Sequence, residues 1–250
     1  MIDVDSHNFA NLPLMKLSSY HKSIGDIVEM VMPICKYDKV YVSKVFTFTL
    51  DIDYEPQADE IVYGGTGYGL ENKLPDEIEH IYPDYSLYSE MTKETAYGFL
   101  TRGCPRNCKF CIVTQKEGCQ SIQVAELGEF WRGQKFITLL DPNLLACINR
   151  EKILQELIDS KAYINFSQGL DIRLTDKYIA EMLKNIKTKI FHFAWDNPNE
   201  NLYGQFGDYG KRGCWATGTS WQGSISTNLT VRYIQSSHLI FRRIGNGTGQ

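Results

Sequence analysis

Residues 97–113 read Tyr-Gly-Phe-Leu-Thr-Arg-Gly-Cys-Pro-Arg-Asn-Cys-Lys-Phe-Cys-Ile-Val and are the most informative stretch of this chain. They contain three cysteines within eight residues: Cys104, Cys108 and Cys111. A loop with this spacing can wrap three thiolates around one cubic iron-sulfur cluster and leave one iron without a protein ligand. Three cationic residues stand beside the thiols: Arg102, Arg106 and Lys109. Because positive charge lowers thiol pKa values and offsets a negative cluster, the stretch predicts an iron-sulfur site.

The alternative for these cysteines is a structural zinc site completed by Cys119 or a histidine, because zinc takes four nitrogen or sulfur ligands. Zinc ligands usually come as two separated pairs, which this triplet does not form. The chain has seven cysteines, and an odd number argues against a disulfide framework. The other four are scattered, and we expect them to be small hydrophobic residues: Cys35, Cys119, Cys147 and Cys214.

The triplet resembles the signature of the radical S-adenosylmethionine (SAM) enzymes, three cysteines spaced three and two apart with an aromatic residue before the third. Here Phe110 is that aromatic residue. The resemblance implies a 4Fe-4S cluster on Cys104, Cys108 and Cys111, with SAM chelated at the open iron and cleaved reductively to a 5'-deoxyadenosyl radical. It also implies a partial (βα)6 barrel, whose first strand and loop match the flanks of the cysteines, and a reductant such as flavodoxin or ferredoxin.

Polar residues that follow later predicted strands extend the resemblance. Asp141 falls where the family places a segment near the SAM amino group, although the glycine pair of that segment is missing here. Gln168, Asp171 and Arg173 look like the segment that surrounds the SAM ribose and carboxylate, and the Phe110 backbone would also help place SAM. The alternative for Asp141, Asp171 and Arg173 is turn capping and a solvated ion pair.

The predicted elements of residues 91–203 alternate between strands and helices. The strands are expected at 95–100, 136–140, 163–167 and 189–194. The helices are expected at 150–160 and 175–185, with Asn149 and Thr175 as N-caps. Repeated βα units build a doubly wound sheet or a barrel, and in both the chemistry lies at the carboxyl ends of the strands. The pattern leaves both architectures open, and the family resemblance implies a partial TIM-type (β/α) barrel domain here.

Residues 1–90 are expected to form a separate, small Rossmann-like α/β domain with a mostly parallel sheet. Its strands are predicted at 2–4, 26–32, 39–45 and 60–63, and its helix at 12–23. The stretch from Pro75 to Tyr88, rich in proline and tyrosine, is predicted to be a linker.

This first domain has a weaker resemblance to cobalamin-binding domains, on residues that follow its strands: Asp5, Ser6, His7, Ser43, Gly64 and Gly65. In that family a histidine of an Asp-x-His-x-x-Gly motif ligates cobalt, but Ala10 replaces the glycine here. The domain is also short for enclosing a corrinoid. We expect a degenerate domain that keeps the fold without cobalamin, with His7 as a surface turn residue and the glycines as a turn.

Residues 204–250 differ in composition from the rest, with nine of the twenty glycines and no glutamate. Strand-like runs at 229–234 and 238–244 are the elements predicted there. Two further strand-helix units would complete a family barrel. Their absence from the pattern predicts an incomplete barrel, through truncation, frameshift or replacement, and a non-catalytic remnant is therefore an alternative to an active enzyme.

Composition narrows the other classes of function. The longest apolar run is five residues, against the ~20 that cross a bilayer, and the N-terminus has no basic leader. We therefore expect a cytoplasmic protein that does not enter a membrane. Residues 1–203 hold 29 acidic and 21 basic side chains, which argues against broad nucleic-acid binding. A small-molecule or peptide substrate fits better, and the sequence does not identify it.

Overall fold

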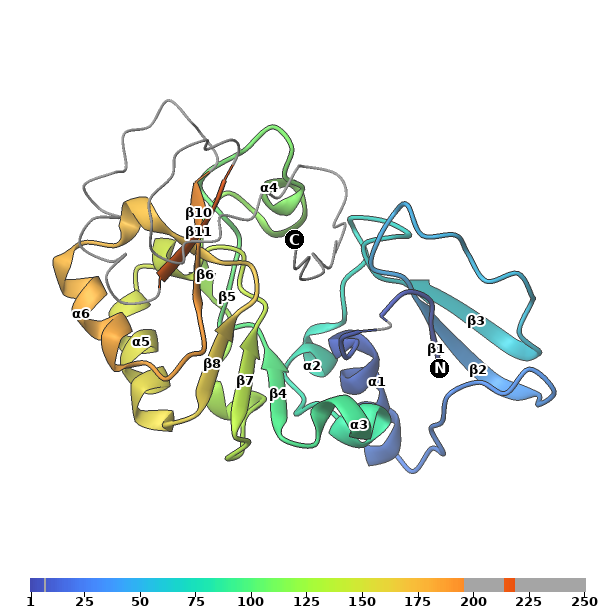
Figure 1. Ribbon diagram of the computed structural model, residues 1–250. Helices are drawn as coiled ribbons and strands as arrows, with labels where there is room; N and C mark the ends of the chain where they lie inside the picture. The colour runs from blue at the N-terminus through green and yellow to red at the C-terminus, as the bar shows by residue number, and fades with distance from the viewer. Residues whose placement is uncertain (7, 196–213, 219–250) are drawn as a thin grey trace, which may run out of the picture.

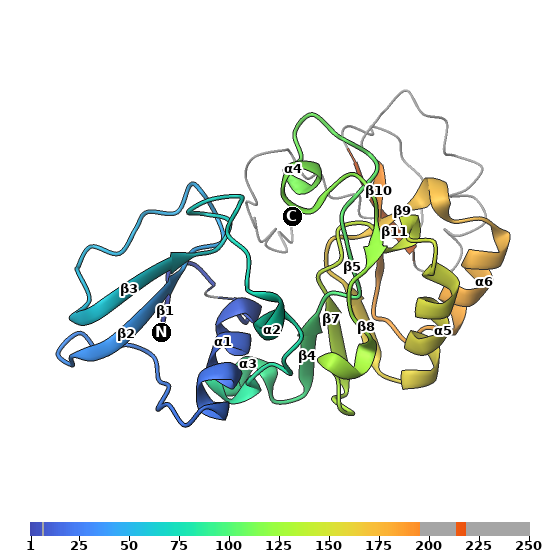
Figure 2. The ribbon, with the colours of Figure 1, turned by 180° about the vertical axis from the view of Figure 1, so that it is seen from behind.

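The computed structural model describes residues 1–6, 8–195 and 214–218, and its fold class is α/β. Parallel strands form two groups, one in the N-terminal third and one in the remainder. Helices α1 to α3 lie between these groups when the chain is viewed from either side (Figures 1 and 2). The α/β prediction is therefore confirmed at the level of class.

The N-terminal sheet has the order β1-β2-β3, with all strands parallel: β1 (Ile2–Asp3), β2 (Tyr37–Ser43) and β3 (Ala58–Gly64). Helix α1 (Leu12–Ser23) packs on it, and the side chain of its N-cap, Asn11, accepts a hydrogen bond from the Leu14 amide. The predicted strand at 26–32 is wrong. That segment has no partner strand among the described residues, although the Val31 amide donates to the Met1 carbonyl and the Met1 ammonium group donates to the Glu29 carbonyl.

The segment predicted to be a linker is folded instead. It contains α2 (Asp76–Glu79) and the 3-10 helix η1 (Tyr85–Tyr88), and α3 (Ser89–Thr92) follows directly. The hydroxyl of Tyr85 donates a 2.6 Å hydrogen bond to the carbonyl of Phe130, and Tyr88 is 8% exposed. Tyr85 and Tyr88 therefore contact both groups of strands, because the Tyr88 hydroxyl donates to Asp3 of the first group and Tyr85 bonds Phe130 in the second.

The second group begins with a parallel sheet of order β4-β7-β8: β4 (Thr95–Gly98), β7 (Phe136–Leu139) and β8 (Tyr163–Phe166). A second parallel sheet has the order β11-β10-β9: β9 (Leu170–Asp171), β10 (Phe191–Trp195) and β11 (Cys214–Gly218). A short antiparallel pair joins β5 (Thr101–Arg102) to β6 (Ile122–Gln123).

The helices of this second part are α4 (Val113–Glu117), α5 (Arg150–Ser160) and α6 (Lys177–Asn185), with 3-10 turns η2 (Leu127–Glu129), η3 (Leu144–Ala146) and η4 (Ile172–Leu174). One apolar core joins α5 and α6 to the strands, and Ile153, Leu154 and Ile179 are fully buried in it. Asn149 occupies the N-cap of α5, but its side chain donates to Gln123 and makes no capping hydrogen bond. The predicted cap of α6 is wrong by one residue, because Asp176 accepts the Ile179 amide at 2.8 Å.

The described strands of residues 91–218 form separate three-stranded sheets and show no closed barrel. β11 was not predicted from the sequence pattern, and it pairs in parallel with β10. The strand-like runs predicted at 229–234 and 238–244 lie outside the described residues. In the described part of the chain, none of the helices combines the length and the apolar character needed to cross a membrane.

Candidate functional site

The three cysteines lie on a long loop that the β5-β6 pair closes at its base, with Arg102 opposite Ile122. The Cys104 amide donates to the Gly118 carbonyl at 3.1 Å, which ties the start of the loop to the end of α4. Gly103 has a φ of +85°, and a Cβ there would lie 2.0 Å from the Gln120 carbonyl oxygen. The close approach of two backbone segments therefore requires glycine before the first cysteine.

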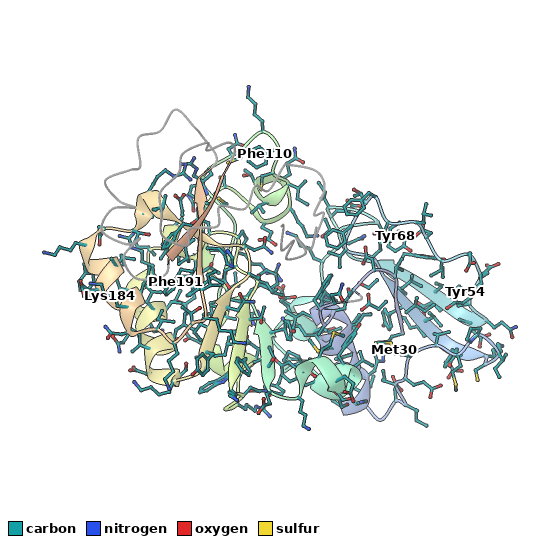
Figure 3. The ribbon with its side chains drawn as sticks, in the orientation of Figure 1. Met30, Tyr54, Tyr68, Phe110, Lys184 and Phe191 are labelled. Atoms are coloured by element: carbon teal, nitrogen blue, oxygen red, sulfur yellow. The ribbon has the colours of Figure 1, made fainter. Side chains whose placement is uncertain are left out.

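Cys104, Cys108 and Cys111 are each partly exposed on this loop, beyond the carboxyl ends of β4 and β7 (Figure 1). The Cys111 amide donates to the Cys108 carbonyl at 2.9 Å, which makes a tight turn between them. Phe110 is 55% exposed and lies at the outer side of the loop beside α4 (Figure 3). The aromatic side chain of the motif is therefore accessible to a ligand or partner.

The remaining described cysteines differ from one another. Cys147 is 2% exposed, as expected of a small hydrophobic residue, and Cys35 is partly exposed. Cys119 is exposed, so the prediction that it is buried as a hydrophobic residue is wrong. It follows Gly118, whose φ of +100° turns the chain outward at the end of α4. The side chain of Cys214 lies outside the description.

Asp141, which follows β7, forms hydrogen bonds with the segment that leads into the cysteine loop. It is 5% exposed, and its carboxylate accepts hydrogen bonds from the amides of Leu100 and Thr101 and from the Thr101 hydroxyl. Burial raises the pKa of Asp141 to about 6, although these donors favour the charged form. Both oxygens are engaged with the protein, so direct contact of Asp141 with SAM stays a prediction.

Asn143 brings the same segment into contact with a cysteine sulfur. It is 5% exposed, and its Nδ2 lies 3.5 Å from the Sγ of Cys104. Its backbone carbonyl accepts a 2.9 Å hydrogen bond from the hydroxyl of Ser121, at the far end of the loop. Its Oδ1 is buried and has no hydrogen-bond partner among the described residues. An unsatisfied buried acceptor is costly, and a bound group with a donor would satisfy it.

Arg102, one of the three cations expected beside the cysteines, forms ion pairs with two carboxylates. The Arg102 guanidinium lies 3.0 Å from carboxylate oxygens of both Glu79 and Glu117, and it stacks 3.8 Å from the Phe99 ring centroid. Glu117 also accepts from the Gly103 amide. Arg102 therefore holds the stem of the loop against α2 and α4, and the role of its charge beside the cysteines stays a prediction.

The other predicted SAM residues lie at the next sheet. Asp171 is 6% exposed, and its carboxylate accepts from the Arg173 Nε at 2.6 Å and Nη2 at 2.9 Å. The two residues form a bidentate ion pair between β9 and η4. Gln168 is exposed in the turn before Gly169, whose φ is +80°. The structure thus joins Asp141 to the cysteine loop and joins Asp171 to Arg173.

The three cysteines are not arranged around a single metal ion in the described structure. Among the described residues, no group of three or more His, Cys, Asp or Glu side chains is arranged to hold one metal ion. A cubic cluster makes a different demand, because each thiolate binds a different iron. Three partly exposed thiols lie on one loop, next to a buried amide with an unsatisfied acceptor, and whether they hold a cluster stays a prediction.

The residues on which the resemblance to cobalamin-binding domains rests lie at the carboxyl edge of the N-terminal sheet. His7 lies outside the described residues. Asn11 connects two of them, because its Nδ2 donates to the hydroxyls of Ser6 and Ser43. Asp5 accepts from the amides of Val45 and Phe46. These polar side chains therefore satisfy one another within the protein. Gly65 has a φ of +92° over the Lys44 carbonyl, as the predicted turn requires.

A large open cavity of about 930 Å³ lies between α1 and residues 82–93. Its lining includes Ser19, Tyr82 and Lys93, and none of the lining residues belongs to the cysteine loop. Its polar groups are engaged locally, as in the bonds from Ser19 to the Tyr82 carbonyl and from Thr92 to the Tyr85 carbonyl. The cavity therefore carries less chemistry than the loop.

Sequence reasoning missed Asn143 and Ser121, which bond to each other at the cysteine loop, where Asn143 also contacts Cys104. It also missed Asn11, which bonds to Ser43 at the edge of the N-terminal sheet. The available signal for Asn143 was its place two residues after Asp141 at a strand end, and for Asn11 its N-cap position before Pro13. Neither signal names the partner across the fold. Comparisons of this chain with protein-family models, with curated proteins and with solved structures find no match.

Proposed function

We propose that this chain is a radical SAM protein that binds a 4Fe-4S cluster through Cys104, Cys108 and Cys111 and cleaves SAM reductively. The observation that carries the proposal is the three-cysteine loop at the carboxyl ends of β4 and β7, fastened from beneath by Asp141 and Asn143. Substrates bind at this end of parallel β/α folds, so the thiols lie where such chemistry occurs. The substrate is an unidentified small molecule or peptide.

A partial barrel is part of the proposal. β10 lies near β8, because the rings of Phe166 and Phe191 stack at 5.9 Å and the Ile164 amide donates to the Lys187 carbonyl at 2.7 Å. Figure 3 labels Phe191 beside the strands that it joins. The parallel sheets β4-β7-β8 and β9-β10-β11 would then follow one another around a common core, as the strands of an open barrel do.

Several residues would hold SAM. The unsatisfied Oδ1 of Asn143 is an acceptor suited to the SAM ammonium group, beside the thiolate of Cys104. The backbone of Phe110 and the side chains of Gln168, Asp171 and Arg173 would supply the further contacts that the family resemblance implies. When bound, a reduced 4Fe-4S cluster supplies the electron that cleaves SAM to methionine and a 5'-deoxyadenosyl radical. The electron would come from a flavodoxin or ferredoxin, and the protein would work in the cytoplasm.

The test is anaerobic reconstitution with iron and sulfide, followed by metal analysis and a dithionite-driven assay for 5'-deoxyadenosine. About four irons per chain and product formation are expected, and both are lost in Cys108→Ala. Cys119→Ala is the matched control, because Cys119 lies on the same loop and is exposed. It should leave the iron content unchanged. A structural zinc site completed by Cys119 would instead give zinc without iron, and its metal would be lost in Cys119→Ala.

The same experiment distinguishes an active enzyme from a non-catalytic remnant. A cluster without 5'-deoxyadenosine would identify a non-catalytic radical SAM relative that keeps the cluster loop. Cobalamin binding is not favoured, because Ser6 and Ser43 already accept from Asn11 within the protein. Titration with hydroxocobalamin, followed by its visible spectrum, should show no bound corrinoid.

A further inference from the structure

Asn143 contacts both the start and the end of the cysteine loop. Its side-chain Nδ2 lies 3.5 Å from the Cys104 sulfur at the start of the loop, within the range of hydrogen bonds to sulfur. Its backbone carbonyl accepts the Ser121 hydroxyl at the end of the loop. Both Asn143 and Ser121 are at least nine-tenths buried. The amide is therefore held against the sulfur rather than free to turn into solvent.

The chemistry of the sulfur selects the orientation of this amide. A free thiol can donate to an amide oxygen or accept from an amide nitrogen, so either orientation would serve it. A thiolate bound to iron has no proton and only accepts. The observed orientation, with Nδ2 toward Cys104 and Oδ1 left without a partner, suits a ligating sulfur.

We propose that Asn143 is a positioning residue that raises the reduction potential of the cluster through its hydrogen bond to the Cys104 sulfur. This inference rests on the proposed function. Reduction adds negative charge to the cluster and its sulfur ligands, and an N–H donor stabilises that charge more in the reduced state than in the oxidised state. Loss of the donor should lower the ratio of reduced to oxidised cluster about tenfold at a fixed potential.

The test is a redox titration of the reconstituted full-length protein, followed by the electron paramagnetic resonance signal of the reduced cluster. Asn143→Leu removes the donor and keeps a similar volume. Its midpoint potential should be lower by the amount that corresponds to an about tenfold lower ratio of reduced to oxidised cluster. Asn143→Asp keeps the shape, removes the donor and adds negative charge, so its midpoint should be lower still. Ser121→Ala is the matched control, because it removes the loop contact to the Asn143 carbonyl and keeps the N–H donor.

The outcomes separate the inference from the proposed function. A wild-type chain that assembles no cluster overturns both. Clusters with equal midpoints in wild type and both Asn143 variants overturn the inference alone. An equal shift in Ser121→Ala also overturns it, because loosening of the loop would then be the cause. Failure of both Asn143 variants to assemble a cluster, while Ser121→Ala does so, would assign Asn143 a purely structural role.

Discussion

The hydroxyl of Thr101 donates a 2.7 Å hydrogen bond to the carboxylate of Asp141, and both side chains are buried. The amide of Thr101 donates to the same oxygen. This contact joins the chain after β4 to the chain after β7, directly below the loop that carries the cysteines. The position of the loop therefore depends on a buried acid rather than on the sheet hydrogen bonds alone.

Thr101→Val tests that contact, because it removes the hydroxyl and keeps the branched shape. A hydrogen bond to a charged acceptor contributes about 1.5–3 kcal/mol, and one to a neutral acceptor about 1 kcal/mol. The free energy of unfolding should therefore fall more at pH 7.5, where Asp141 is ionised, than at pH 4.5, where it is protonated. Urea unfolding at the two pH values measures this, and an equal loss at both would contradict the assignment.

Asp141→Asn tests the titration itself. Burial raises the pKa of Asp141 to about 6, so the folded chain holds a proton that the unfolded chain releases near pH 4. Linkage then lowers the free energy of unfolding as the pH rises from about 4 to about 6, by up to ~3 kcal/mol from this group. The wild type should lose this stability across that window relative to Asp141→Asn. A constant difference between the two proteins across pH 4–7 would refute a raised pKa.

Gly103→Ala should disrupt the start of the cysteine loop. A Cβ at this position meets the Gln120 carbonyl oxygen at 2.0 Å, and the φ of +85° is strained for alanine. We expect a loss of more than about 3 kcal/mol and poor iron incorporation. Gly118→Ala is the control, because its φ is +100° with open space around the Cβ. It should cost about 1–3 kcal/mol from backbone strain alone, without the steric clash. Similar losses in both variants would show that the backbone contact is unimportant.

The sequence predicted elements whose signals are local. The bounds of α1 and α5 match the expected 12–23 and 150–160, because spaced apolar residues and polar caps define a helix without help from the rest of the fold. The strand expected at 26–32 has a suitable apolar pattern, but Val28 and Met30 pack against the core around Leu14 without a partner strand. A strand needs that partner, and the pattern does not encode it.

The site shows the same limit. The cysteine loop is predicted because its ligands lie within eight residues, whereas the contacts of Asn143 and Arg102 depend on segments fifteen or more residues away. Arg102 was expected to face the thiols because it is adjacent in sequence. Glu79 and Glu117, which bind it, were brought there by the fold.

Glu79→Gln tests how the N-terminal part holds the loop. The Glu79 carboxylate lies 3.1 Å from Lys16 and 3.0 Å from Arg102. Burial would raise the pKa of Glu79, but these two cations outweigh it and hold the pKa below its usual value. Its stabilising contribution is therefore present above the unfolded pKa and is lost as the pH falls through the folded pKa.

Glu79→Gln should lower the free energy of unfolding by about 1–2 kcal/mol at pH 7, with a smaller loss at pH 3.5. Glu77→Gln on the same short helix is exposed and should change little. Urea unfolding of both variants measures the difference. Equal effects of the two substitutions would mean that the contacts of Glu79 contribute nothing to stability.

Tyr85→Phe tests whether the segment between the two groups of strands is a structural joint or a linker. The Tyr85 hydroxyl donates to the Phe130 carbonyl at 2.6 Å and accepts from the Tyr97 amide at 3.1 Å. Removing it leaves both groups without this partner in a buried place, at a cost of about 1–3 kcal/mol. Tyr178→Phe, 59% exposed on α6, is the control and should be neutral. Limited proteolysis should cut near Tyr85 faster in Tyr85→Phe, whereas a linker would be cut equally fast in the wild type.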